Sequence, residues 1–110
     1  MLVDNKFLFL SIPRCASHSF VIGCGIIGIE NRYVSNKATE IYKNFNWTED
    51  IDLSKIYHPH ESLIELEKKF GSDYKIISIK RNRYDRFISL WKYANTAKIL
   101  SSSNWLFRYI

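Results

Sequence analysis

Hydrophobic residues occur along the chain in short runs that alternate with segments of helical periodicity. Residues 7–12 form a run that is almost entirely apolar and ends at Pro13. Such a run is typical of a strand covered on both faces in a parallel sheet. A helix is predicted to begin near His18, where Ser17, His18 and Ser19 offer side chains that can cap it. The front of the chain is therefore predicted to be a central strand followed by a helix.

The rest of the chain repeats this order of elements. Residues 31–52 are polar with no clean period and are predicted to be loop, apart from one short helix over 36–45. A strand is expected over 53–57, a helix over 61–70 and another strand over 74–80. Apolar residues then recur at a helical spacing that predicts a buried stripe: Phe87, Leu90, Trp91, Ala94 and Ala97. Alternating strands and helices predict an α/β fold with a parallel sheet.

Length and composition indicate one globular domain. The chain has 110 residues, and its 46% of hydrophobic and 15% of aromatic residues exclude a disordered protein. A formal net charge of +5 favours an anionic partner. Charge alone does not distinguish nucleic acid, acidic lipid and a phosphorylated small molecule.

The cysteines and the apolar runs predict the compartment. Cys15 and Cys24 have the spacing of neither a zinc site nor a disulfide framework, which favours a reducing, cytoplasmic location. The apolar runs 7–12 and 20–29 are too short to cross a bilayer, so no membrane span is expected. Residues 104–110 are bulky and apolar with no polar tail, and we expect the domain to be incomplete at its C-terminus.

The first candidate binding loop covers residues 13–19. It joins the predicted strand to the start of a helix, where backbone N–H groups at the positive end of the helix dipole can hold a phosphate. Arg14 adds charge, Ala16 and Ser17 are small enough for close approach of a ligand, and Ser17 and Ser19 add hydroxyl donors. A capped turn with an exposed arginine would show the same pattern, so both interpretations stay open for this loop alone.

The second candidate loop follows the strand predicted at 74–80. It places four cationic side chains within seven residues: Lys80, Arg81, Arg83 and Arg86. Arg81 leaves the strand end and Ser89 lies about one and a half turns into the next helix, so both could converge on one phosphate. Arg86 is expected to have a structural role, paired with Asp85 or a helix terminus. Ligands of parallel α/β sheets lie beyond the carboxyl ends of the strands, where both loops fall.

The two loops together resemble the sulfotransferases that use 3′-phosphoadenosine 5′-phosphosulfate, especially the branch that acts on carbohydrate. The matching segments are Phe9-Leu10-Ser11-Ile12-Pro13-Arg14 through Ser19, and Arg81-Asn82-Arg83-Tyr84-Asp85-Arg86-Phe87-Ile88-Ser89-Leu90-Trp91. The resemblance implies a P-loop NTPase-like fold, a small-molecule nucleotide donor, a hydroxyl acceptor and no metal. It implies that the 5′-phosphosulfate is held by Arg14, Cys15, Ala16, Ser17, His18 and Ser19. It also implies that Arg81 and Ser89 hold the 3′-phosphate.

Four positions depart from the family pattern. Family members usually carry lysine at Arg14, threonine or serine at Cys15, threonine at His18 and proline at Arg83. Arg14 can still neutralise charge on the bridging oxygen as the sulfuryl group leaves, although a guanidinium delivers a proton less readily than an ammonium. Backbone donors do most of the cradling in such loops, so the anion site is expected to tolerate the other changes.

Transfer also requires a base that accepts the proton of the acceptor hydroxyl. His58 best matches the histidine that the family places between the two loops, and His60 and Glu61 are alternatives. A histidine that only caps the helix near Glu61 is an equally open interpretation. With His58 as base and Arg14 at the leaving group, transfer would proceed in line, without a covalent enzyme intermediate.

Two other functions are compatible with parts of the sequence. Gly23, Gly25 and Gly28 have the spacing of a dinucleotide-binding fingerprint, with residues 19–22 as a short strand before them, which would indicate a flavin or nicotinamide protein. Alternatively, the cations of residues 80–92 with Trp91 and Tyr93 could form a nonenzymatic nucleic-acid-binding module. The glycine spacing leaves residues 81–89 unexplained, and Trp91 fits the predicted buried stripe with Phe87 and Leu90. Nucleic acid is not expected as a partner of the sulfotransferase.

Overall fold

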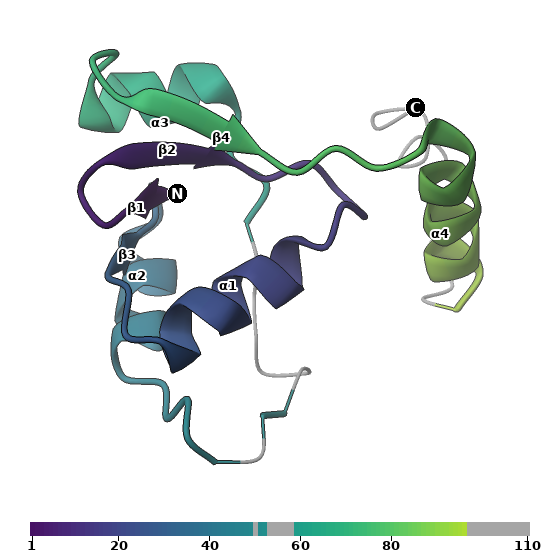
Figure 1. Cartoon of the computed structure of the whole chain (residues 1–110), viewed down its shortest axis with the longest axis horizontal. Coiled ribbons are helices and arrows are strands. Elements are labelled where there is room, and N and C mark those ends of the chain that lie inside the picture. The colour runs from purple at the N-terminus through teal and green to yellow at the C-terminus, as the bar shows by residue number, and fades with distance from the viewer. Residues whose placement is uncertain (50, 53–58, 97–110) are drawn as a thin grey trace.

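The computed structural model of the chain describes residues 1–49, 51–52 and 59–96. These residues form a small α/β fold in which helices flank a mixed, four-stranded sheet (Figure 1). In chain order the elements are β1 (Leu2–Val3), β2 (Phe7–Leu10), α1 (Ser17–Ile26), β3 (Asn31–Arg32), α2 (Asn36–Lys43), α3 (Leu63–Phe70), β4 (Lys75–Ser78) and α4 (Arg83–Thr96). The strand expected over 53–57 lies outside the described residues.

The sheet has the strand order β3-β1-β2-β4. The sequence predicted a parallel sheet, and this prediction was wrong, because the sheet is mixed. β2 and β4 are parallel, with Phe7 opposite Lys75 and Leu10 opposite Ser78. β1 is antiparallel to both β2 and β3. The reason is the turn between β1 and β2, which is too short for the crossover that parallel strands need. In it Asp4 and Asn5 have φ values of 51° and 50°, as in the type I′ turns of hairpins.

The helices begin close to the predicted positions, but two of their caps differ. No side chain among the described residues caps α1, which follows Ala16 in the left-handed conformation. α3 has a capping box, in which Ser62 Oγ accepts from the N–H of Glu65 and a carboxylate oxygen of Glu65 accepts from the N–H of Ser62. A histidine cap at this helix, which the sequence left open, is therefore not what starts it.

The core lies on both faces of β2. Phe9 packs with Val21 of α1 and Tyr42 of α2 on one face, whereas Leu8 packs with Leu66 of α3 on the other. Figure 1 shows α1 and α2 on one side of the sheet and α3 on the other. Leu8 and Phe9 are both almost fully buried, and each contributes about 2–3 kcal/mol through burial. The prediction of a central strand covered on both faces is confirmed.

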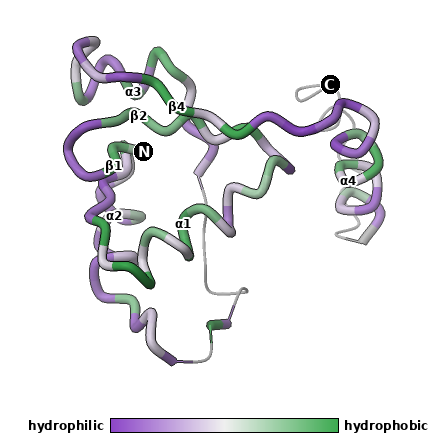
Figure 2. The backbone as a smooth tube through the Cα atoms, viewed as in Figure 1, coloured by the Kyte–Doolittle hydropathy of each residue, from purple (hydrophilic) through white to green (hydrophobic). Residues whose placement is uncertain are grey.

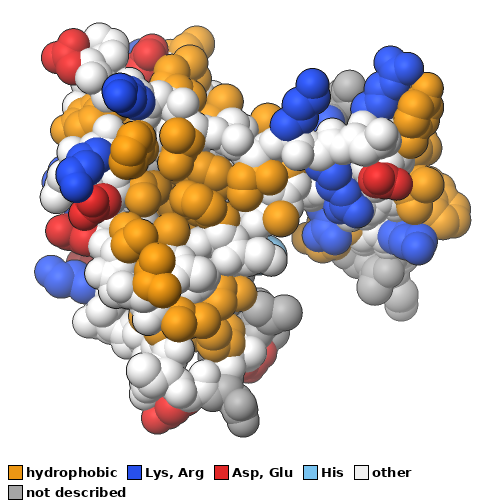
Figure 3. All heavy atoms as spheres, viewed as in Figure 1, with side chains coloured by type: hydrophobic (Ala, Val, Ile, Leu, Met, Phe, Trp, Pro, Cys, Tyr) orange, Lys and Arg blue, Asp and Glu red, His pale blue; other side chains and the backbone are white. Residues whose placement is uncertain are grey.

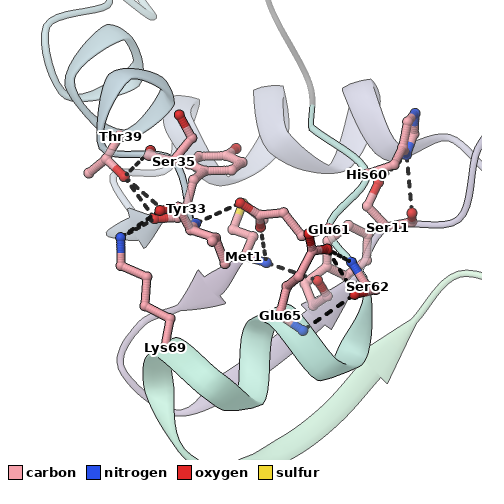
Figure 4. A network of polar contacts seen from close by, with 12 residues as sticks. Met1, Ser11, Tyr33, Ser35, Thr39, His60, Glu61, Ser62, Glu65 and Lys69 are labelled. Carbon is pink, nitrogen blue, oxygen red and sulfur yellow. Dashed lines mark hydrogen bonds and ion pairs between the residues drawn. The ribbon is translucent and has the colours of Figure 1, made fainter.

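A polar network, buried around Glu61 and exposed around Lys69, joins α3 and the residues before it to the residue before β1 and to the segment that follows β3 (Figure 4). One carboxylate oxygen of Glu61 lies 3.0 Å from the amino group of Met1, and the other accepts from the N–H of Val34 at 2.6 Å. The Nζ of Lys69 donates to the carbonyl of Val34 at 2.6 Å and to Oδ1 of Asn36 at 2.9 Å. Glu61 is thus held inside the fold by two partners.

α4 lies at the far side of the molecule from β3 and follows a hydrophilic connection from β4 (Figures 1 and 2). Leu90 and Ala94 are buried, with exposed fractions of 2% and 1%. Phe87 and Trp91 are 48% and 53% exposed, so their predicted membership of a buried stripe was wrong. Ala97 lies outside the described residues. The apolar spacing of α4 therefore belongs to two different faces of the helix.

Candidate functional site

The two predicted loops leave the same edge of the sheet. β2 and β4 are parallel neighbours, so their carboxyl ends point in the same direction. The loop that follows β2 leads to α1, and the connection that follows β4 leads to α4. Between these loops the described chain contains α1, β3, α2, α3 and β4, and the sheet brings the beginnings of the loops together.

The backbone of the first loop has the alternation that forms an anion-binding nest. Arg14 and Ala16 have φ values of 61° and 59°, whereas Cys15 between them is not among the residues with positive φ. Alternating signs of φ turn successive N–H groups towards one side, which creates a concavity for an anion. Left-handed conformations in residues other than glycine cost on the order of 1 kcal/mol each and are frequent at functional sites. This loop continues directly into the N-terminus of α1, which lacks a side-chain cap among the described residues.

The side chains of the first loop divide into buried and exposed groups. Cys15 and Ser17 are buried, and the hydroxyl of Ser17 donates to the carbonyl of Ile12 at 3.1 Å. Ser17 is therefore engaged in shaping the loop, where the sequence suggested a ligand donor. Ala16, His18 and Ser19 are exposed. The N–H of Cys15 donates to the carbonyl of Ile12 at 3.2 Å, so of these two buried residues it is Ser17 that would meet a ligand through its backbone N–H.

Residues from the second loop and from α4 contact the first loop directly. Nη1 of Arg81 donates to the carbonyl oxygen of Arg14 at 3.1 Å, and Nε of Arg14 donates to Oγ of Ser89 at 2.9 Å. The structure therefore brings together Arg14, Arg81 and Ser89, which are up to 75 residues apart in the chain. These are the residues for which the sequence predicted contacts with the two ends of one nucleotide.

Two further residues of α4 complete this contact. Nε of Arg86 donates to the carbonyl of Pro13 at 3.0 Å, in keeping with the structural role expected for Arg86. The guanidinium of Arg14 lies over the ring of Tyr93, 5.0 Å from its centroid. Sequence analysis did not place Tyr93 in this site, and it expected Asp85 or a helix terminus, not the carbonyl of Pro13, as the partner of Arg86. The signal was present, because residues 86, 89 and 93 are spaced so as to share one face of a helix.

Cations concentrate around this contact. Lys80, Arg81, Arg83 and Arg86 lie on and before α4, and Arg14 faces them from the first loop. Figure 3 shows the Lys and Arg side chains gathered over the α4 side of the molecule. Such a concentration of positive charge creates a potential that attracts anions to this edge of the sheet.

Two histidines lie near Arg14. Nδ1 of His60 is 3.1 Å from both the carbonyl oxygen and Oγ of Ser11 (Figure 4). Because a carbonyl only accepts, its hydrogen bond assigns the proton of the neutral ring to Nδ1 and leaves Nε2 as the basic nitrogen. Burial lowers the pKa of His60, the Ser11 carbonyl opposes this shift, and Arg14 lowers the pKa further.

The pKa of His18 is lowered for related reasons. Partial desolvation is the main cause although the side chain is exposed, and the positive charges that His60 and Arg14 can carry lower the pKa further. The lowered pKa of each ring favours its neutral form, in which a histidine can accept a proton. His58, the first choice for the base, lies outside the described residues. Glu61 is engaged by Met1 and Val34, which leaves it poorly suited to act as the alternative base.

The glycines of the possible dinucleotide fingerprint occupy a different environment. Gly23 and Gly25 lie inside α1, so the strand expected before them at 19–22 is the first half of a helix. Gly28 has a φ of 74° and lies just after that helix. The ring of Trp47 packs directly on Gly25. Packing against Trp47 thus explains Gly25, and the turn that ends α1 explains Gly28, whereas nothing in the described structure requires glycine at position 23.

In comparisons with known proteins, no protein-family model, curated protein or solved structure matches this chain. Within the described part of the chain, no helix is both long and apolar enough to cross a membrane. The same residues contain no group of three or more His, Cys, Asp or Glu side chains that could hold a metal ion.

Proposed function

We propose that this chain binds 3′-phosphoadenosine 5′-phosphosulfate across its two strand-to-helix loops and transfers the sulfuryl group to a hydroxyl, on a carbohydrate acceptor. The observation that carries the proposal is the contact of Arg14 with both Arg81 and Ser89. This contact joins the two loops through the residues that, in this proposal, bind the two phosphorylated ends of the adenosine donor. In this proposal β2, the first loop and α1 form a P-loop-like unit, with β4 as the neighbouring parallel strand.

Each loop takes one end of the donor. The N–H groups of the first loop and of the start of α1 hold the 5′-phosphosulfate, supported by the alternating φ values of residues 14–16. The guanidinium of Arg81 and the hydroxyl of Ser89 hold the 3′-phosphate through charge-assisted and neutral hydrogen bonds. Arg14 links the two halves, because its carbonyl contacts Arg81 and its side chain contacts Ser89.

The reaction is an in-line displacement at sulfur. The acceptor oxygen forms a bond to sulfur while the bond from sulfur to the bridging phosphate oxygen breaks, which yields a sulfate ester and adenosine 3′,5′-bisphosphate. Arg14 stabilises the negative charge that develops on the bridging oxygen. His58 accepts the proton of the acceptor hydroxyl, with the neutral imidazole of His60 as the alternative within the described residues.

A ligand series in a thermal unfolding assay tests the proposal against its competitors. Adenosine 3′,5′-bisphosphate at one hundred times its dissociation constant should stabilise the protein by about 2.7 kcal/mol. For a domain of this size that corresponds to a rise in Tm of about 10 °C or more. NAD, FAD and a single-stranded oligonucleotide should have smaller effects. A larger shift with a dinucleotide would favour a dinucleotide-binding protein and overturn the proposal.

A further inference from the structure

The outward face of α4 is apolar from its start to Trp91. Tyr84, Phe87, Ile88 and Trp91 have exposed fractions of 64%, 48%, 50% and 53%. Their spacing of three, four and seven residues places them on one side of the helix. The opposite side carries Arg86, Ser89 and Tyr93, which contact the first loop. The helix is thus attached to the domain by its polar face, with an apolar face directed outwards.

Cations border this apolar face. At 100° per residue, Arg83 and Lys92 lie about a quarter turn to either side of its centre. The guanidinium of Arg83 lies 4.8 Å from the centroid of the Tyr84 ring, so it stands at the rim of the face. Asp85 is the single acidic residue in the sequence of α4. Figure 3 shows hydrophobic side chains at the outer edge of this region with Lys and Arg side chains beside them.

We propose that this face of α4 binds an anionic lipid surface as an interfacial helix. Exposed aromatic and aliphatic side chains enter the region below the headgroups, while long cationic side chains at the rim reach the phosphates and carboxylates of anionic lipids. The complementary charge identifies the lipid as anionic. Ile88, at the middle of this face, favours lipid over nucleic acid, because an aliphatic side chain offers a base neither stacking nor a hydrogen bond.

This binding goes beyond the proposed sulfuryl transfer and does not depend on it. The lipid-facing residues lie on the side of α4 opposite to Ser89, so membrane binding leaves the contacts between the two loops in place. The two functions can therefore be tested separately. A protein that fails to bind adenosine 3′,5′-bisphosphate is still expected to bind anionic vesicles.

Vesicle cosedimentation with the full chain tests the inference. We expect binding to phosphatidylcholine vesicles that contain about one third phosphatidylserine, and at least about tenfold weaker binding to pure phosphatidylcholine. Ile88→Asn should weaken binding to the anionic vesicles by about tenfold, because it removes an inserted apolar side chain. Ile64→Asn is the matched control, since Ile64 is 65% exposed on α3, and it should leave binding unchanged.

A charge-reversal pair keeps the test valid if Ile88→Asn disturbs the fold. Arg83→Glu combined with Lys92→Glu changes two exposed side chains and should abolish the preference for anionic vesicles, whereas Lys37→Glu combined with Lys68→Glu should retain it. Equal binding to both vesicle types, or equal losses in the test and control variants, would overturn the inference. The inference would also be overturned if the protein did not bind vesicles and instead bound a single-stranded oligonucleotide through this face. It would be overturned as well if the protein did not bind vesicles and formed a dimer that Ile88→Asn dissociates.

Discussion

The contact between Gly25 and Trp47 predicts opposite effects for the same substitution at two positions of α1. A methyl carbon built on Gly25 would lie 2.6 Å from Cε3 of Trp47 and still closer to two other atoms of that ring. A methyl carbon built on Gly23, two residues earlier in the same helix, would meet no atom of the described residues within 4 Å. Gly23→Ala is therefore the matched control for Gly25→Ala.

The magnitudes follow from helix propensity and overpacking. Alanine in place of glycine inside a helix gains about 1 kcal/mol, so Gly23→Ala should stabilise the protein by roughly that amount. At Gly25 the same gain is opposed by overpacking, which costs about 1–3 kcal/mol. Three ring atoms would overlap the new methyl group, so the upper part of this range applies. Gly25→Ala should therefore destabilise the protein by about 1–2 kcal/mol.

Urea unfolding of the two variants measures the difference, and a double-mutant cycle identifies its cause. In a Trp47→Leu background the overlap is relieved, so Gly25→Ala should stabilise that protein by up to about 1 kcal/mol. Equal effects of Gly23→Ala and Gly25→Ala in the wild-type background would refute the packing explanation. A destabilisation by Gly25→Ala that persists without Trp47 would refute it as well.

The capping box and the histidines give two further predictions. Ser62→Ala should lower the free energy of unfolding by about 1 kcal/mol in a urea titration, because it removes the side-chain cap of α3. Ser72→Ala, at an exposed position, is the control and should have little effect. The pKa of His60 and that of His18 are lowered in the folded state, so the unfolded chain binds more protons as the pH falls through about 6.5. Stability should therefore fall between pH 7 and pH 5, and His60→Asn should reduce this fall in urea midpoints measured across that range. A pH dependence that His60→Asn leaves unaltered would contradict the assignment to His60.

Sequence periodicity located the longer elements because it reports burial. The run that contains β2 is apolar on both faces, and the structure places Leu8 and Phe9 in cores on opposite sides of the sheet. The strands β1 and β3 have two residues each, which is too short for any period to be visible. The antiparallel pairing of β1 with β2 depends on the turn at Asp4 and Asn5. Because this pairing was not predicted, the sheet was expected to be parallel but is mixed.

Apart from Ser89 in α4, the residues of the candidate site could be predicted where they follow strands. Arg14 and Arg81 were found because the carboxyl ends of parallel neighbours share one edge of a sheet. The contacts of Arg86 and Tyr93 depend on which face of α4 turns towards the first loop. That orientation was predicted wrongly, because apolar spacing was taken as a sign of burial. Exposed Trp91 and buried Leu90 are adjacent in sequence, and only the placement of the helix distinguishes them.

The central claim is that Arg81 holds one end of a nucleotide that also occupies the loop after β2, and calorimetric titration with adenosine 3′,5′-bisphosphate tests it most directly. Arg81→Ala should weaken binding by about 30-fold, the loss expected for a charge-assisted hydrogen bond of about 2 kcal/mol. Arg83→Ala removes the same charge from a side chain that contacts Tyr84, and it should weaken binding by less than about threefold. Absence of binding to the wild-type protein, or equal losses in the two variants, would contradict the account.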